Sequence, residues 1–486
     1  MDDPAAPKQS SPSCLSPCRS AAQGWASVAQ VEAEEKRNLW ILAGHQIVYG
    51  VGWIFKTESV IMPAFLDAVA GPGAGLLRGF LPVLNRLGQG ASQIFLVSWL
   101  RRMALKKRAL AVFAAAMALP LAAMSGLWIA GAGQANLLLV LAVMGCYFLF
   151  FVLNGFYLLS FGTVQGKLIR PTHRGRLLRR STFLGTLAAT GFAVWLLPGW
   201  LQGNQQAQPY FHWIFLWAAG CLGLSAMVAL ALREPHDQVS NNLPRRSARN
   251  LGDMIRALQA DPNLRRVGLV AICLGAGLIV WPHYQALALG KFQCPPIELM
   301  RFAITQNIAV GIASLLVGPM ADAWGNRLTL RLVIWGAAGA PGLAALLTLL
   351  PADLSGSLSW LIFIPLGLSP LLLPILNNYT LETCPLHRHP RYLSTVNLCV
   401  AIPFLLAPAA GWAVEYVGYG PVFGVAAAFW LLAGLLTFRI AEPRRLPAVP
   451  PQLPLAELDG SLVTNILAEQ ELPPPAEQSN PNASLT

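Results

Sequence analysis

Long apolar runs separated by short polar stretches dominate the chain from about position 40 to position 440. Each run has about 20 residues, which as a helix crosses the ~30 Å hydrocarbon core of a bilayer. The pattern predicts an all-α integral membrane protein with about 12 transmembrane helices in two sets of six. The predicted spans cover 40–65, 76–97, 108–130, 135–160, 181–200 and 210–232, then 265–289, 298–320, 328–350, 357–380, 393–416 and 419–440.

The polar stretches divide the chain into five parts. We expect a disordered N-terminal tail (1–38), an N-terminal six-helix bundle (39–232), a cytoplasmic linker (233–264), a C-terminal six-helix bundle (265–441) and a disordered, Pro-rich C-terminal tail (442–486). Apolar residues in the linker recur at the spacing of one helix face, namely Leu251, Met254, Ile255 and Leu258. This spacing predicts a short amphipathic helix on the cytoplasmic membrane surface.

The charged residues are few and unevenly placed. They make up 12% of the chain, against roughly 25% in a soluble protein. The net charge is +12, and Lys and Arg gather in alternate loops, as at 101–108, 167–180 and 233–266. Because loops rich in Lys and Arg stay in the cytoplasm, we expect both termini to be cytoplasmic, in an inner or plasma membrane. This topology accounts for the net charge, so we expect no nucleic-acid partner.

The two sets of spans resemble each other in sequence. Trp99 and Arg102 follow span two, and Trp324 and Arg327 follow span eight, both at an offset of 225 residues (324 − 99 and 327 − 102). The repeat predicts two pseudo-symmetric bundles. Transporters that rock one half against the other around a central site often contain such repeats.

The loop between spans eight and nine carries a specific motif. It reads GPMADAWGNRLTLR from Gly318 to Arg331, and Gly318 and Pro319 are expected to end span eight. Its Gly, Asp, Gly and Arg positions resemble the loop motif of the major facilitator superfamily of transporters. The second Arg of that motif is replaced here by Leu328.

This resemblance implies the superfamily's fold over about 40–440 and a gating role for Gly318, Asp322, Gly325 and Arg327. In the superfamily the glycines let two helices approach closely, and the acid pairs with nearby basic groups. Asp322 is therefore expected to hold the loop against a neighbouring helix, in a contact that breaks when the protein switches state. The N-terminal copy is degraded, with Gln93 and Val97 at the positions of Gly318 and Asp322.

Three charged residues lie several turns inside the first two predicted spans, where each charge near the membrane centre costs about 2.5–3.5 kcal/mol. Lys56 and Glu58 lie in span one, and Arg86 lies in span two. Residues two apart on a helix do not face each other. We therefore expect Glu58 to pair with Arg86 and Lys56 to face a substrate cavity. The alternative is a salt bridge that only fastens helices.

Spans four and seven carry further polar candidates. Asn154 and Tyr157 lie in span four, and His283, Tyr284 and Gln285 follow Pro282, which is expected to kink span seven. In the superfamily, spans one, four, seven and ten line the central cavity, so the resemblance makes these residues candidate substrate contacts. The alternative is that each makes a hydrogen bond between helices. His283 and Glu58 are also candidate proton carriers.

The sequence contains no catalytic constellation, phosphate-binding loop or Cys/His spacing for a metal, so we expect no enzyme activity, cofactor or metal. We expect a monomeric secondary active transporter that moves a small solute across the bilayer by alternating access. Proton coupling, as in a symporter, stays open. Lys56 and Arg86 outnumber Glu58, which favours an anionic organic solute. Two alternatives are an exporter of amphipathic, drug-like compounds and a non-transporting membrane sensor with the same fold.

Overall fold

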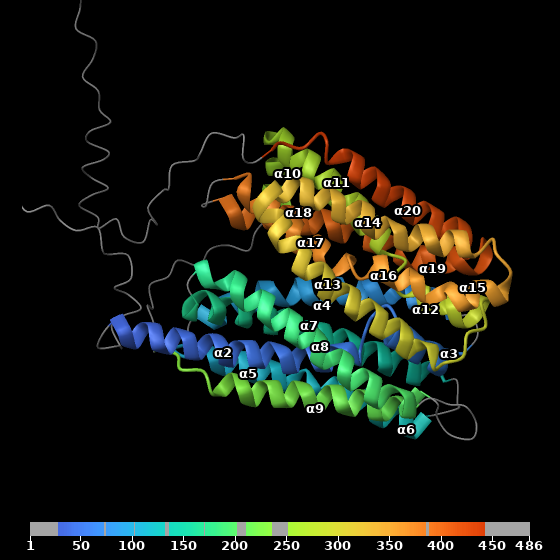
Figure 1. The fold of residues 1–486 in the computed structure, drawn as a ribbon, viewed down its shortest axis with the longest axis horizontal. Coiled ribbons are helices and arrows are strands. Elements are labelled where there is room, and N and C mark those ends of the chain that lie inside the picture. The colour runs from blue at the N-terminus through green and yellow to red at the C-terminus, as the bar shows by residue number, and fades with distance from the viewer. Residues whose placement is uncertain are drawn as a thin grey trace, which may run out of the picture.

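The structure is a computed structural model that describes residues 28–71, 74–101, 103–131, 136–169, 171–201, 210–235, 251–384 and 388–442. The helices of the first part of the chain form one bundle and those of the second part another, stacked one above the other in Figure 1. The predicted tail residues 1–27 and 443–486 and the linker residues 236–250 lie outside the described residues.

The N-terminal bundle consists of α2 (Val28–Ile54), α3 (Ile61–Ala70), α4 (Gly75–Arg101), α5 (Lys106–Ala116), α6 (Ala118–Gly131), α7 (Leu137–Leu168), α8 (Pro171–Leu201) and α9 (Phe211–Leu230). The C-terminal part consists of α10 (Leu251–Ala260), α11 (Pro262–Leu278), α12 (His283–Ala286), the π-helix η1 (Leu287–Lys291), α13 (Glu298–Trp324), α14 (Asn326–Leu347), α15 (Ala352–Leu358), the 3-10 helix η2 (Ser359–Ile362), α16 (Phe363–Leu366), α17 (Ser369–Glu382), α18 (His389–Ala401), the 3-10 helix η4 (Ile402–Leu406), α19 (Ala407–Tyr416) and α20 (Tyr419–Leu436).

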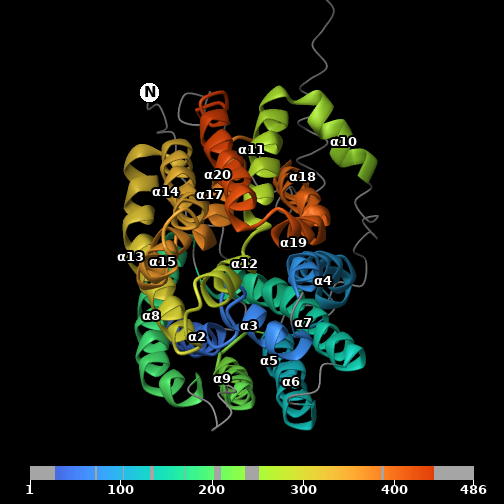
Figure 2. The ribbon, with the colours of Figure 1, turned by 90° about the vertical axis from the view of Figure 1, so that its right-hand side faces the viewer.

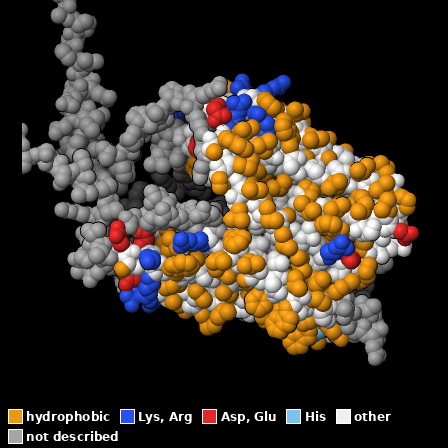
Figure 3. Space-filling model, viewed as in Figure 1, with side chains coloured by type: hydrophobic (Ala, Val, Ile, Leu, Met, Phe, Trp, Pro, Cys, Tyr) orange, Lys and Arg blue, Asp and Glu red, His pale blue; other side chains and the backbone are white. Residues whose placement is uncertain are grey.

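Ten helical segments in the described residues are long and apolar enough to cross a membrane. The first two predicted spans correspond to α2 with α3 and to α4. Helices α2 and α4 have 27 residues each, but they carry more polar side chains, such as His45 and Arg86. The predicted all-helical membrane fold is thus confirmed. Hydrophobic side chains are spread over the described part of the face shown in Figure 3, and Lys and Arg are gathered in a few places, as expected for a surface in contact with lipid.

Two of the predicted spans are interrupted at matching places in the two bundles. Span one is not one helix, because α2 ends at Ile54 and α3 starts at Ile61. A proline ring clashes with the carbonyl four residues before it, so Pro63 prevents a continuous helix through Ser59. Span seven breaks where α11 ends at Leu278, four residues before Pro282, as the sequence predicts.

Span eight runs further than the sequence predicts. The expectation that Gly318 and Pro319 end it is wrong, because α13 includes both residues and continues to Trp324. The turn falls at Gly325 alone, whose φ of +87° is a conformation that favours glycine. Helix α14 then begins at Asn326.

Glycines at equivalent positions let the first and last helices of each bundle pack closely. A β-carbon on Gly52 of α2 would lie 2.9 Å from the β-carbon of Cys221 on α9. At the position 225 residues later (277 − 52), a β-carbon on Gly277 of α11 would overlap the indole of Trp430 on α20. Trp430 is fully buried and donates from Nε1 to the carbonyl of Leu274 at 3.0 Å.

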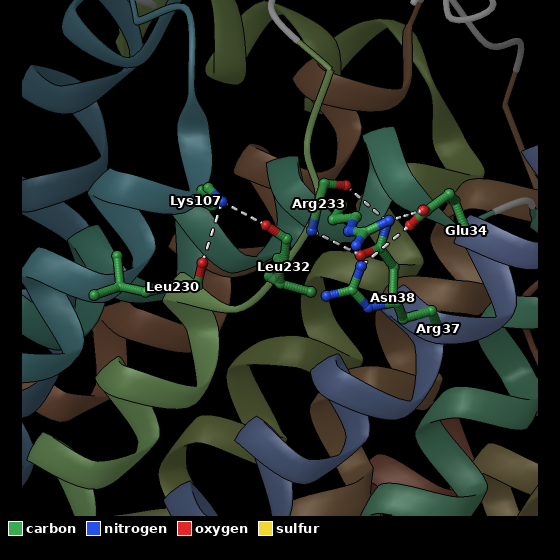
Figure 4. Close-up of polar contacts among 7 residues, drawn as sticks. All are labelled: Glu34, Arg37, Asn38, Lys107, Leu230, Leu232 and Arg233. Atoms are coloured by element: carbon green, nitrogen blue, oxygen red, sulfur yellow. Dashed lines mark hydrogen bonds and ion pairs between the residues drawn. The ribbon is translucent and has the colours of Figure 1, made fainter. Parts of the chain in front are cut away.

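The helix ends of the N-terminal bundle are tied together where α9 finishes (Figure 4). The side chain of Asn38 on α2 donates to the carbonyl of Arg233 at 2.8 Å and accepts from its backbone N–H at 3.0 Å. Glu34 forms an ion pair with Arg233 at 2.5 Å, and Lys107 Nζ donates to the carbonyls of Leu230 and Leu232. These bonds satisfy carbonyls that a helix C-terminus leaves without partners.

A buried acid, Glu234, joins the starts and ends of further helices at the same place. The carboxylate of Glu234 accepts from the backbone N–H groups of Lys106 and Lys107 at the start of α5, at 3.0 and 2.7 Å. It also forms an ion pair with Lys167 Nζ at 2.7 Å, at the end of α7. We name the end of the molecule that carries Lys106, Lys107, Lys167, Arg233 and Arg327 the basic end.

We predict that Gly277→Ala lowers the thermal stability of the purified protein. The new methyl group must displace Trp430, which breaks its hydrogen bond, and overpacking of this kind costs about 1–3 kcal/mol. The measurement is the midpoint of thermal unfolding. The control is Gly424→Ala on α20, where a β-carbon meets open space. Equal midpoints for Gly277→Ala and the control would contradict the packing role.

Candidate functional site

Lys56 lies at the interruption of span one, enclosed by aromatic rings. Its side chain is 1% exposed, and Nζ lies 3.7, 4.2 and 4.7 Å from the ring centroids of Trp53, Phe151 and Phe150. Nζ also forms an ion pair with Glu58 at 3.0 Å. The expectation that Lys56 and Glu58 cannot face each other is wrong, because the helix ends before them and helical spacing no longer applies.

Glu58 connects this aromatic box to α4. Its second carboxylate oxygen accepts a short hydrogen bond from Asn85, next to Arg86. The described contacts contain no ion pair between Glu58 and Arg86, the pairing that the sequence predicts. The Arg86 guanidinium instead lies 4.9 Å from the ring centroid of Phe404, in η4 of the C-terminal bundle.

Glu58 and Arg86 both line a cavity between the two bundles. Its volume is about 20 Å³, which is room for about one water molecule. Trp281 lies in the wall at the interruption of span seven, and its indole N–H is buried without a partner among the described residues. The interruptions of spans one and seven therefore meet at one cavity, and with Lys56 beside it the two basic groups outnumber the acid.

The polar candidates of span four make hydrogen bonds inside the N-terminal bundle. The Tyr157 hydroxyl accepts from Gln46 Nε2 at 2.7 Å and lies 3.0 Å from His45 Nε2. Asn154 Oδ1 accepts from the hydroxyl of Tyr49 at 3.0 Å, and the rings of Tyr49 and Tyr157 stack at 4.5 Å. Neither Asn154 nor Tyr157 is among the residues that line the cavity.

The residues of α2 in this hydrogen-bonded cluster are not among those that the sequence predicts. The Nδ1 atom of His45 lies 2.8 Å from the carbonyl oxygen of Ser225, so His45 also connects this cluster to α9. A signal was present in the sequence, because His45, Tyr49 and Trp53 recur every four residues and therefore share one helix face.

The polar residues of span seven lie beyond the cavity, away from the basic end. Gln285 Nε2 donates to Asp67 Oδ2 at 2.9 Å, and Asp67 forms an ion pair with Arg78 at 2.5 Å. His283 and Tyr284 are completely buried, and neither imidazole nitrogen nor the phenol hydroxyl has a partner among the described residues. Asp67 and Arg78 are not among the residues that the sequence predicts, because their pairing depends on how α3 packs against α4.

Three polar contacts join the two bundles across this region, and we name them the latch. They are Gln285 to Asp67, Ser59 Oγ to Gln306 Oε1 at 2.6 Å, and the Gly75 N–H to Glu415 Oε1 at 2.5 Å. In these three hydrogen bonds between the bundles, both partners are described residues. The latch lies towards the end opposite the basic end.

The predicted gating residues lie on two consecutive helices of the C-terminal bundle, α13 and α14, and in the turn between them. Arg327 donates to the carbonyls of Thr437 and Phe438 at 3.1 and 2.8 Å, and its guanidinium lies 3.9 Å from Glu442. It thus caps the C-terminus of α20. Gly318 lies on α13 with open space around it. The side chains of Asp322, Gln93 and Val97 lie outside the described part of the chain.

The chain matches no protein-family model and no curated protein sequence. Solved structures do match it over most of their length. A D-xylose–proton symporter has a TM-score of 0.62 at 12% identity, covering 84% of this chain and 98% of the other. The nucleoside transporter NupG has a TM-score of 0.54 at 13% identity, covering 83% and 98%.

A third structure, the E. coli fucose–proton symporter FucP, has a TM-score of 0.54 at 12% identity and covers 84% of this chain and 100% of the other. Identities this low concern the arrangement of helices and not the chemistry of a site. The shared arrangement of helices agrees with the loop motif and the two-fold repeat of the sequence. The chain has the fold of the major facilitator superfamily of transporters.

Proposed function

We propose that this protein is a secondary active transporter that moves a small solute by alternating access between its two bundles. The observation that carries the proposal is the cavity that Glu58 and Arg86 line between the bundles, beside Lys56. Charged groups inside a membrane are expensive and usually mark a transport path. Interrupted helices that meet at a site between repeats support the same proposal.

An organic anion is the solute class that the charges of this site favour. Lys56 has Glu58 as its counter-ion at 3.0 Å, whereas Arg86 has no acid within ion-pair distance among the described residues. A guanidinium binds carboxylate or phosphate through two parallel N–H groups. The buried N–H of Trp281 offers a further donor, and Leu81 and Leu278 offer apolar walls for the body of the solute.

The arrangement of the bundles supports an inward-facing state. If the basic end is cytoplasmic, as the distribution of Lys and Arg indicates, the latch closes the extracellular side. The switch to the outward-facing state would break the latch and close the basic end. We propose that the motif of Gly318, Asp322, Gly325 and Arg327 acts at that second contact, with Asp322 held by a neighbouring helix.

Proton coupling would use an acid or an imidazole near the path. Glu58 is the candidate beside the cavity, and His283 is the candidate beside the latch. Asn154, Tyr157, Tyr284 and Gln285 would act through the packing of spans four and seven. An exporter of amphipathic compounds is the second candidate, favoured by the aromatic rings of Tyr147, Trp281 and Phe404 around the cavity.

We predict that an organic anion raises the melting temperature of the purified protein and that Arg86→Gln abolishes this rise. A ligand at a hundredfold excess over its Kd stabilises the folded state by about 2.7 kcal/mol. The measurement is thermal unfolding against a panel of anionic, cationic and neutral organic solutes. Arg301→Gln is the control, because Arg301 on α13 packs over Trp360 in η2 and lies outside the cavity.

Variants that change the net charge beside the cavity test the same proposal further. Lys56→Gln leaves Glu58 free to neutralise Arg86, so the stabilisation by anions should fall at least tenfold in apparent affinity. The double variant Lys56→Gln/Glu58→Gln restores the excess positive charge and should recover most of it. Stabilisation by cationic amphiphiles alone would favour the exporter, and unchanged anion binding in Arg86→Gln would contradict the proposed site.

We also predict that weakening the latch exposes the cavity from the side opposite the basic end. In Asp67→Asn/Glu415→Gln both latch carboxylates become neutral, so the contacts that they accept from Gln285 and from the Gly75 N–H at the start of α4 weaken. A membrane-impermeant thiol reagent should then label His283→Cys several-fold faster than in the intact latch, after subtraction of native cysteine labelling. Asp353→Asn, an exposed acid on α15, is the control. Equal labelling rates would show that the latch does not hold the bundles closed.

A further inference from the structure

Arginine side chains from two neighbouring helices surround the end of α20, the last helix of the C-terminal bundle. Arg327 and Arg331 on α14 donate to the carbonyl and the hydroxyl of Thr437 at 3.1 and 2.8 Å. Arg266 on α11 donates to the carbonyl of Arg439 at 3.0 Å. We name Arg266, Arg327, Arg331 and Arg439 the arginine cluster. In Figure 2, α20 lies between α14 and α11, on the side of its bundle that faces away from the N-terminal bundle.

The charge of the arginine cluster is largely unbalanced. Glu442 lies 3.9 Å from Arg327, and among the described residues no other acid forms an ion pair with the cluster. The net charge of these five residues is therefore +3 (4 − 1). The end of α20 holds Arg327 and Arg331 through its carbonyls, whereas Arg266 and Arg439 are exposed. These two arginines are therefore accessible to an anion from outside the protein.

The cluster lies where the membrane-spanning parts of three helices end. The apolar segments of α11 and α14 begin at Pro262 and Asn326, and that of α20 ends at Leu436. Lys and Arg close to such limits lie at the level of the lipid headgroups. Exposed leucines follow towards the middle of the membrane, namely Leu269 on α11, Leu332 on α14 and Leu435 on α20. The surface thus changes from basic to apolar in the direction of the hydrocarbon core.

This order of charge and apolar surface determines the class of ligand. Neighbouring guanidinium groups favour a phosphate, which accepts paired N–H groups from each of them. The exposed leucines beside them favour acyl chains over a small soluble anion. The positive cluster repels the choline ammonium of phosphatidylcholine, so a headgroup with a net negative charge fits better. An anionic phospholipid meets all three requirements.

We propose that the arginine cluster binds an anionic phospholipid of the leaflet at the basic end, with its phosphate at Arg266 and Arg439 and its acyl chains along the exposed leucines of α11 and α20. The site lies on the outer side of the C-terminal bundle, apart from the cavity at Arg86, and does not depend on the identity of the transported solute. Because Arg327 belongs to the cluster and follows the turn at Gly325, the lipid binds next to the loop that joins α13 to α14.

The test is a competition between phosphatidylglycerol and phosphatidylcholine of equal chain length. The purified protein is equilibrated with equal amounts of both, and native mass spectrometry counts the lipids that stay bound. The wild-type protein should retain phosphatidylglycerol about tenfold more than phosphatidylcholine, since one arginine near an anionic headgroup contributes about fivefold. The double variant Arg266→Gln/Arg439→Gln removes the two exposed guanidinium groups and should lose most of this preference.

The control removes the same charge from the same end of the other bundle. Arg37 on α2 and Arg108 on α5 are both exposed at the basic end. The double variant Arg37→Gln/Arg108→Gln should therefore keep the preference of the wild-type protein. An equal loss in this control would show that any positive charge at the basic end attracts the lipid, and it would overturn the proposed site.

A third variant changes the charge in the opposite direction. Glu442→Gln neutralises the acid beside Arg327 and raises the net charge of the cluster by one. The retention of phosphatidylglycerol should then rise several-fold, a gain that a folding defect does not produce. An unchanged preference in Arg266→Gln/Arg439→Gln, no gain in Glu442→Gln, or displacement of the lipid by equimolar glycerol 3-phosphate would each contradict the proposal.

Discussion

The ion pair between Lys56 and Glu58 is the interaction on which the centre of this molecule depends. In a membrane, a charge and a free backbone group both need partners within the protein. The interruption of span one creates free backbone groups, and the same few residues place the ammonium of Lys56 among three aromatic rings and against a carboxylate. The interruption thus lets Lys56 and Glu58 meet although they are only two residues apart, and Asn85 extends the pair to α4.

Because of the two-fold repeat, both bundles have an interrupted first helix that packs closely against the last helix. Pro63 and Pro282 interrupt the first helix of each bundle, and Gly52 and Gly277 let that helix pack against the last one. Without a strong hydrophobic force between helices in lipid, close packing at small residues supplies much of their association. Each bundle is therefore held together by close helix packing at these glycines.

The sequence predicts the fold well because its signals are long and repeated. Apolar runs, loop charges and the Gly318–Arg331 motif lead to the observed helices, and Pro282 locates one interruption. The site is harder to predict from the sequence, because the apolar run through Lys56 and Glu58 predicts a continuous helix, and the helix is interrupted there. The partners of Tyr157 and Asp67 depend on how separate helices pack, and no local pattern specifies that. The spacing of His45, Tyr49 and Trp53 along one helix face does, however, indicate one part of this polar cluster from the sequence alone.

The ties at the basic end have a mechanical consequence. The Asn38 clasp on Arg233 and the Arg327 cap on α20 each close within one bundle. A movement of one bundle relative to the other would therefore leave both of these helix caps intact. In the proposed switch, each latch bond would contribute a net of only about 1 kcal/mol. A shift from 1:99 to 99:1 takes about 5.5 kcal/mol, so a solute would change the preferred state through the difference between its affinities for the two states and not through tight binding alone.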